Sequence, residues 1–264
     1  MGTDYSLIKS KFLWFVGMGG LVGSIAWTVY TQEWIYWVVS YVYFRCISVV
    51  SNNISLHRYF AHKSFKTGPR RHQLLAWITL LSGVGSPFIY AIHHRHHHKH
   101  SDKPQDLHSP RENFWRSFLG TWVLKDTKWW IEEKKVTLFP RDLIRDPSVK
   151  FITEHYHKMW LGLVALAWLI GGFKFCVFFM LAPVGWNLFQ GAMVNCIDHL
   201  KLPGSYRNYD TDDYSYNNKV LNWFLLGEGL HNNHHQDQSN YKQAHKADEY
   251  DPAGWIIEKF FKIN

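Results

Sequence analysis

The sequence predicts an all-α integral membrane protein, with four transmembrane helices and a cytosolic helical cap that holds a histidine-rich site for two metals. Three observations predict this fold class. Several long stretches of the 264-residue chain contain almost no charged residue. The polar residues are concentrated in two blocks, about 93–158 and 198–264, so the mean hydropathy of −0.24 conceals a segregated chain. Six of the 17 histidines fall within residues 91–102.

The first two predicted spans cover residues 12–32 and 34–56. No charged residue occurs between Lys11 and Glu33, and an uncharged helix of this length can cross about 30 Å of hydrocarbon. A signal peptide is the alternative, but the apolar stretch is too long and no A-x-A cleavage pattern follows it. Arg45 interrupts the second span. An arginine at this depth normally faces protein or water, and the sequence names no partner for it.

The last two predicted spans, 159–173 and 175–197, are separated by Lys174 alone and are expected to form a tight hairpin. The first of them is short for a full crossing. Four crossings return the chain to the side from which it began. We therefore expect one domain over residues 1–264, with both termini on the same side of the membrane.

The distribution of lysine and arginine predicts the side on which the cap lies. The expected cap comprises residues 57–158 and 198–264. Its part from 99 to 158 is dense in Lys and Arg, whereas the turn at Thr31–Glu33 has neither. By the positive-inside rule, the cap and both termini are cytosolic. The net charge of +8 partly reflects this bias and suits acidic partners or anionic lipid, and no nucleic-acid-binding motif accompanies it.

Histidines next to the apolar runs form three clusters whose spacings suit metal binding. On a helix, residues i and i+4 lie about 40° apart, whereas residue i+3 points to the other side of residue i. The spacing H-x-x-H-H can therefore serve two ions at once. The clusters are H-R-Y-F-A-H with His57 and His62, H-R-H-H-H with His94, His97 and His98, and H-N-N-H-H with His231, His234 and His235.

The helical spacing divides these histidines between two ions. His94 and His98 can share one ion while His97 faces the other. The third cluster repeats the pattern, with His231 and His235 together and His234 apart. Imidazole binds Fe, Zn, Cu and Ni, and a structural zinc site needs only about four ligands. Eight clustered histidines therefore indicate two metal ions.

Further polar residues are expected at the same site. Asn195 and His199 are spaced i, i+4 in N-C-I-D-H, at the mouth of the last span. Alone, His199 is equally compatible with an ordinary interfacial histidine, but beside the three clusters a ligand is the better interpretation. Hydrogen-bonding or exposed roles, rather than ligation, are expected for His93, His96, His100 and His108.

Residues 73–92 contain no charged residue and could form a further span. If they crossed the membrane, the first and second histidine clusters would lie on opposite sides and could not share metals. The segment is broken by Gly83, Gly85 and Pro87. We therefore expect it to lie along the interface, or to dip into it, without crossing.

The three cysteines, Cys46, Cys176 and Cys196, lack metal-type spacing and lie in or beside apolar runs. An odd number of cysteines in such surroundings does not suggest a disulfide framework. We expect all three to be thiols of the core.

The three clusters, with G-E-G ahead of the third and N-x-x-x-H at 195–199, resemble the integral-membrane fatty acyl desaturases of the stearoyl-CoA (Δ9) type. The resemblance runs from about Leu56 to His235 and is specific as a set. In that family nine histidines hold two irons in a cytosolic cap on four transmembrane helices, and a kinked tunnel presents the acyl chain to them. The resemblance implies an O2-dependent enzyme that introduces a cis double bond, at Δ9, into a saturated acyl chain.

The resemblance also implies roles for individual residues. One iron would be held by His57, His62, His94, His98 and His234. The other would be held by His97, His199, His231 and His235, with Asn195 reaching it through water. Surrounding the ligands without binding metal would be His93, His96, Asp106, His108 and Glu228.

Two features depart from the family pattern. The E-W pair that usually precedes the second cluster is replaced by F-I-Y-A-I-H at 88–93, with Tyr90 in place of Trp. The acyl carrier therefore stays open among CoA, acyl carrier protein and a glycerolipid. The chain also lacks an H-P-G-G cytochrome b5 signature, so electrons are expected from a separate ferredoxin or cytochrome b5.

Two other functions stay open on the sequence alone. Hydroxylation or ketolation of a lipid chain would use the same metal site, because it diverges from desaturation only after the first C–H cleavage. A non-catalytic metal-binding or metal-transporting membrane protein would instead place polar ligands at mid-membrane. The candidate ligands here gather at helix ends and in the cap.

Overall fold

The computed structural model describes residues 4–126, 128–137 and 139–263, which are mostly helical. In the first half the α-helices are α1 (Asp4–Thr31), α2 (Trp34–Ser48), α3 (Pro69–Ile78), α4 (Pro87–His100) and α5 (Phe114–Phe118). In the second half they are α6 (Arg141–Ile144), α7 (Pro147–Cys176), α8 (Ala182–Cys196), α9 (Lys219–Leu225), α10 (His231–Gln236) and α11 (Pro252–Ile256).

Shorter segments of 3-10 or π geometry connect or extend these helices. They are η1 (Val49–Ala61), η2 (Thr79–Ser82), η3 (Thr121–Leu124), η4 (Trp129–Glu133), η5 (Val177–Leu181), η6 (Ile197–His199) and η7 (Ile257–Phe261). Two short strands, β1 (Ser205–Tyr206) and β2 (Asn217–Asn218), pair antiparallel with Ser205 opposite Asn218.

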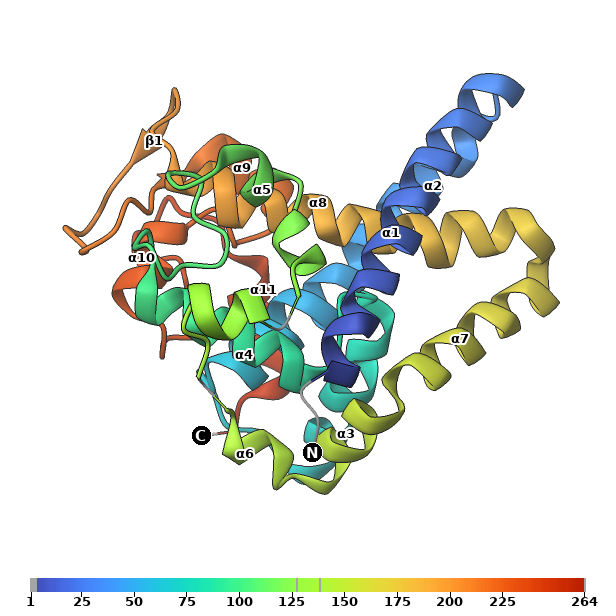
Figure 1. The fold of residues 1–264 in the computed structure, drawn as a ribbon. Coiled ribbons are helices and arrows are strands. Elements are labelled where there is room, and N and C mark those ends of the chain that lie inside the picture. The colour runs from blue at the N-terminus through green and yellow to red at the C-terminus, as the bar shows by residue number, and fades with distance from the viewer. Residues whose placement is uncertain (1–3, 127, 138, 264) are drawn as a thin grey trace.

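Three helical segments of the described chain are long and apolar enough to cross a membrane: Lys11–Thr31, Trp34–Ala61 and Pro147–His199. The third folds back on itself at Gly172, whose backbone is not helical (φ 67°, ψ −164°), and α7 and α8 diverge from this turn (Figure 1). The predicted helical class with several helices of membrane length is confirmed. The predicted hairpin is present, but it turns at Gly172 rather than at Lys174.

Two helices extend beyond the predicted spans. The second span does not end at residue 56, because α2 continues as the π-helical η1 through Ala61. The first histidine cluster therefore lies on the continuation of that span. Helix α7 begins at Pro147 rather than at residue 159. Asp146 caps this start of the helix by accepting hydrogen bonds from the backbone N–H groups of Ser148 and Val149. The first turns of α7 are charged, so hydropathy detects only its apolar part.

Residues 73–92 form a bend instead of a straight helix. The pieces Pro69–Ser82 and Pro87–His100 meet at 82°, and Gly83 (φ 67°) lies in the turn between them. A Cβ atom on Gly83 would stand 2.1 Å from Cγ2 of Val184 in α8, so the bend packs closely against that helix. The bend keeps the first two histidine clusters together, since Nε2 of His62 lies 2.7 Å from Nε2 of His94. The two pieces are apolar enough to form either a broken span or a re-entrant loop, so the expectation that residues 73–92 do not cross the membrane stays a prediction.

The buried core joins the first histidine-bearing helix to its neighbours. Fully buried apolar side chains come from η1, α3, α7 and the C-terminal segment, among them Ile54, Leu75, Ile152 and Ile257. The core also includes side chains of α4. It fixes the direction in which η1 and α4 present their histidines.

Two residues of α2 bear on the expectations drawn from the sequence. Arg45 is half-buried, and its Nη2 donates to the backbone oxygen of Trp223 at 2.9 Å, which supplies the partner that the sequence could not name. Cys46 is exposed, so the prediction that it is a core thiol was wrong, whereas Cys176 and Cys196 are buried. In a membrane helix an apolar neighbourhood faces lipid as readily as protein, so it does not indicate burial.

Candidate metal centre

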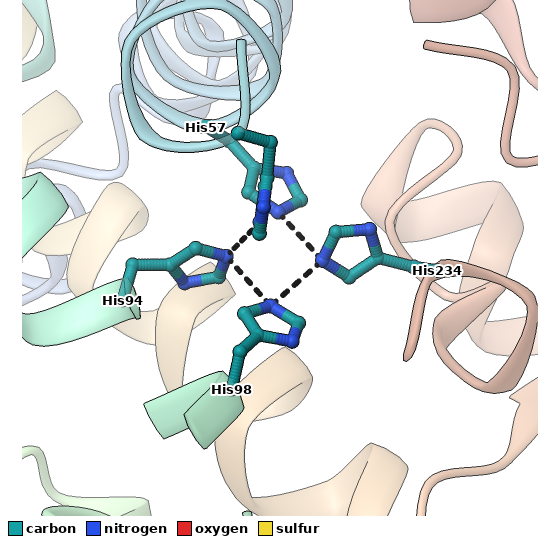
Figure 2. A group of neighbouring side chains, drawn as sticks. His57, His94, His98 and His234 are labelled. Atoms are coloured by element: carbon teal, nitrogen blue, oxygen red, sulfur yellow. Dashed lines mark hydrogen bonds between the residues drawn. The ribbon is translucent and has the colours of Figure 1, made fainter. Parts of the chain in front are cut away.

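Five histidines from three segments converge on one point. His57 and His62 come from the end of η1, His94 and His98 from α4, and His234 from α10. One nitrogen of each lies within 4.8 Å of the others, and we call this set the five-histidine group. Figure 2 shows four of these rings turning their nitrogens toward one another. The Nε2 atom of His234 lies 3.0 Å from that of His57 and 2.9 Å from that of His98.

The π geometry of η1 explains how His57 and His62 meet. In an α-helix, residues five apart point about 140° away from each other. A π turn instead joins residue i to residue i+5, and the backbone N–H of His62 donates to the oxygen of His57 at 3.1 Å. The H-x4-H spacing therefore places both imidazoles on one side of the helix.

A second set of four buried histidines lies beside the first. The four-histidine group comprises His97, His199, His231 and His235, whose nitrogens also lie within 4.8 Å of one another. The two groups adjoin, since the ring centroids of His98 and His235 are 4.4 Å apart. The groups have the memberships expected from the i, i+4 spacing and from the family resemblance. The role of these nine side chains as metal ligands stays a prediction.

Carboxylates hold one nitrogen of four of these rings. The Nδ1 atom of His57 lies 2.5 Å from Glu228, and that of His97 lies 3.0 Å from Asp106. Both acids were expected near the ligands. A ring that donates from Nδ1 keeps a lone pair on Nε2, the atom that points into the group, and such partners fix imidazole ligands in orientation.

Two further carboxylates were missed by the sequence analysis. Asp102 lies 2.7 Å from Nδ1 of His199, and Asp213 lies 2.5 Å from Nδ1 of His235. Asp102 follows α4 with a left-handed backbone (φ 58°), which turns the chain back over the cluster. It belongs to the H-S-D sequence directly after the second cluster, which was an available signal. Asp213 lies in a loop far from any histidine in sequence, and no spacing announces it.

Burial sets the charge of the imidazoles. Burial, with repulsion from neighbouring histidines, holds the pKa of His231 and of His234 well below the usual value, so both rings are neutral near pH 7. Burial alone would raise the pKa of Glu228, but attraction to His57 and Arg58 outweighs it and lowers that pKa to about 2. Neutral imidazole beside anionic carboxylate is the protonation state that binds metal.

The donor set fits metal ions. Within the described chain, the buried Nε2 atoms of His97 and His235 have no hydrogen-bond partner, although both rings are anchored through Nδ1. A buried nitrogen with a free lone pair is costly unless something binds it. Nine imidazoles in two adjoining groups exceed a closed tetrahedral site and suit two ions of the kind that imidazole binds.

The remaining predicted residues surround the two groups. The ring of His108 lies 4.3 Å from that of His97, whereas His93 packs against Trp130, where burial lowers its pKa to about 3. His96 pairs through Nε2 with the backbone oxygen of Gln105 at 3.0 Å. These three histidines stand outside the five- and four-histidine groups. His108 also lies in a third set of buried donors, with His97 and Asp106, so its expected role beside the ligands stays a prediction.

One cavity is lined both by members of the five-histidine group and by helices of membrane length. Its lining includes His57, His94 and Glu228 as well as the apolar Leu13 of α1 and Leu188 of α8. Asn195, expected to act through water, lines the same cavity. Helix α8 tightens into the 3-10 segment η6 after Cys196, so Asn195 and His199 are not one regular α-helical turn apart.

Tyr90 contacts both the cavity and the five-histidine group. Its ring stacks on that of His94, with centroids 5.5 Å apart and an interplanar angle of 27°, and it lines the cavity. This is the position at which the sequence departs from the family pattern. The departure therefore affects the wall next to the five-histidine group.

A family model described as fatty acid desaturase matches residues 32–254. The chain belongs to the fatty acid desaturase family. Delta-9 acyl-lipid desaturase 2 of Arabidopsis thaliana is 31% identical over 220 residues, 83% of this chain and 70% of that protein. The sn-1 stearoyl-lipid 9-desaturase of Anabaena variabilis is 28% identical over 264 residues, 100% of this chain and 86% of that protein. An acyl-CoA 5-desaturase of Anemone leveillei is 28% identical over 241 residues, 91% of this chain and 74% of that protein.

Membership of this family makes the desaturase an oxidoreductase that acts on fatty acyl chains. It confirms the resemblance drawn from the histidine clusters. It also decides against a non-catalytic metal-binding membrane protein, which the sequence alone left open.

Proposed function

We propose that this desaturase uses two iron ions and O2 to introduce a cis double bond, at Δ9, into a saturated fatty acyl chain. The observation that carries the proposal is the gathering of nine imidazoles into two adjoining groups, with His57 and His94 lining a partly apolar cavity. The acyl chain would lie in that cavity. Its reacting carbons would face the five-histidine group at His57 and His94, the two members that line the cavity.

Each ion would be held by one group of histidines. The five-histidine group would hold one iron, and the four-histidine group would hold the other with Asn195 acting through water. When bound, reduced iron supplies the O2 activation and C–H cleavage that no side chain can perform. The protein's own part is to fix the imidazoles through Glu228, Asp106, Asp102 and Asp213, and to keep water away from the acyl chain.

The position of the double bond and the acyl carrier rest on the relatives. Two of the relatives described above are named for Δ9 or 9-desaturation of lipid-linked chains, and one for 5-desaturation of an acyl-CoA. We favour Δ9 because the bacterial relative covers the whole chain. On the same grounds, the acyl carrier is a glycerolipid or CoA. The electron donor would be a ferredoxin or cytochrome b5, as the family resemblance implies.

We also propose four membrane crossings in one domain, with the cap and both termini in the cytosol. Helices α1 and α2 would form one hairpin, and α7 and α8 the other. Both hairpin turns point away from α4 and α10, which carry most of the histidines (Figure 1). The bent segment α3–α4 would dip into the interface and return.

Gas chromatography of fatty acids from a desaturase-deficient host tests the proposal. The host expresses the chain together with a ferredoxin and its reductase. We expect a new cis-Δ9 monoene that depends on O2. A product with an added oxygen would favour hydroxylation or ketolation, and a Δ5 product would correct the position alone. The His97→Ala variant, expressed at the same level, is the inactive control.

A further inference from the structure

Only two of the nine clustered histidines reach the surface. Seven are buried, with the most accessible of them, His235, at 8% exposure. His62 and His98 are partly accessible, and both line one shallow surface depression together with Gln238 and Ser239. The five-histidine group therefore has its own contact with solvent, separate from the acyl cavity that His57 and His94 line.

The same depression is lined by cations. Lys63, Arg95 and Lys99 contribute to its wall, and no aspartate or glutamate does. The Lys63 side chain is 58% exposed, and Lys99 is also exposed. Asp142 forms ion pairs with Arg95 and Lys63, and Asp237 accepts a hydrogen bond from Ser239 at the rim. The three cations therefore outnumber these two carboxylates.

The segments that line the depression lie away from the hairpin turns. The end of η1, α4 and the segment after α10 supply its lining residues. In Figure 1, α4 and α10 lie on the side of the molecule away from the turns of α1–α2 and α7–α8. Under the proposed topology a protein in the cytosol can reach the depression without displacing lipid.

We infer that an acidic one-electron carrier protein docks on this depression and delivers electrons to the five-histidine site through the ring edges of His62 and His98. The inference rests on the proposed function. Electron transfer slows steeply with distance, so a donor is most effective where ligand rings meet solvent. Complementary charge steers such encounters and speeds them at low salt.

The electron count requires two docking events in each turnover. Formation of the double bond removes two electrons and two protons from the acyl chain. Two further electrons come from the carrier, which is oxidised by one electron at each encounter, and two protons come from solvent. Together these reduce one O2 to two water molecules.

Charge reversal on the rim tests the docking surface. The iron-loaded full chain in nanodiscs is mixed in a stopped-flow cell with a reduced plant-type [2Fe–2S] ferredoxin, at low ionic strength. We expect the Lys63→Glu/Lys99→Glu variant to be reduced at least about tenfold more slowly than the parent, and to lose most of its salt dependence. Lys128→Glu, which reverses a more exposed lysine elsewhere (76% exposed side chain), should stay within about twofold of the parent.

A small uncharged reductant separates this inference from the proposed function. Photoreduced deazaflavin needs no protein docking, so the double variant and the parent should be reduced by it at equal rates and form product. Equal rates with ferredoxin for both proteins, an equal loss in Lys128→Glu, or no reduction of the parent by ferredoxin would overturn the docking surface. Failure of the parent to form product with deazaflavin would overturn the proposed function, and the docking surface with it.

Discussion

A carboxylate oxygen of Asp213 lies 2.5 Å from Nδ1 of His235, and the same carboxylate accepts from Thr211 and Ser215 in its own loop. The loop between β1 and β2 thereby orients a ring of the four-histidine group. These bonds, with attraction to His235, outweigh burial and lower the pKa of Asp213, so the acid is ionised at neutral pH.

The Asp213→Asn variant should bind metal more weakly at the four-histidine group, because His235 loses the anion that fixes its Nδ1. Loss of such a partner typically costs about 10–100-fold in metal affinity or activity. Iron per chain, measured by mass spectrometry after dialysis against a chelator, checks the expectation. Asp212→Asn is the matched control, since that carboxylate is 94% exposed and pairs with Lys103. Equal iron content in both variants would show that Asp213 does not strengthen metal binding at the four-histidine group.

The His97→Ala and His235→Ala variants should each abolish product while the protein still inserts in the membrane, because each removes one imidazole of the four-histidine group. Product is measured by gas chromatography and insertion by membrane fractionation. His100→Ala, at the end of α4 and outside both groups, should keep its activity. Full activity in either of the first two variants would exclude that residue as a ligand.

The Gly83→Ala variant should destabilise the bend between α3 and α4. An alanine with φ near 67° costs about 1–3 kcal/mol, and its Cβ would also overlap Val184. Thermal unfolding in detergent should show a clear fall in Tm. Gly19→Ala in α1 is the control, because nothing lies within 4 Å of the added Cβ there. A helical Gly→Ala change of this kind is expected to be neutral or stabilising by about 0.5–1 kcal/mol.

The buried guanidinium of Arg58 should matter more than any surface ion pair. Arg58 pairs with Glu228 at 3.0 Å and with Asp251 at 2.9 Å, linking the first histidine cluster to the third and to the C-terminal segment. Arg58→Met leaves both acids buried without a cation, which should cost about 3–5 kcal/mol of unfolding free energy. Lys219→Met breaks an exposed pair with Asp248 and should cost about 1 kcal/mol or less. Equal losses in the two variants would contradict this account.

The division of the histidines could be predicted because it depends on local geometry. The positions of His94, His97 and His98 on one helix determine which rings face together, and α4 is a regular helix throughout. The meeting of His57 with His62 could not be predicted in this way, since it requires a π turn and α-helical periodicity points them apart.

Other features depend on contacts between distant segments. The partner of Arg45 is a backbone oxygen 178 residues away, and the bond from Asp213 to His235 depends on how a loop folds over α10. No spacing in the sequence encodes either contact. The exposure of Cys46 was also missed, because hydropathy does not distinguish a lipid-facing side of a helix from a protein-facing side.

The central claim is that the two histidine groups hold two irons. Anomalous diffraction from crystals of the iron-loaded protein, recorded on both sides of the iron absorption edge, tests it most directly. We predict two iron peaks, one within the five-histidine group and one within the four-histidine group. A single peak, peaks at the zinc edge only, or iron located away from these histidines would contradict the account.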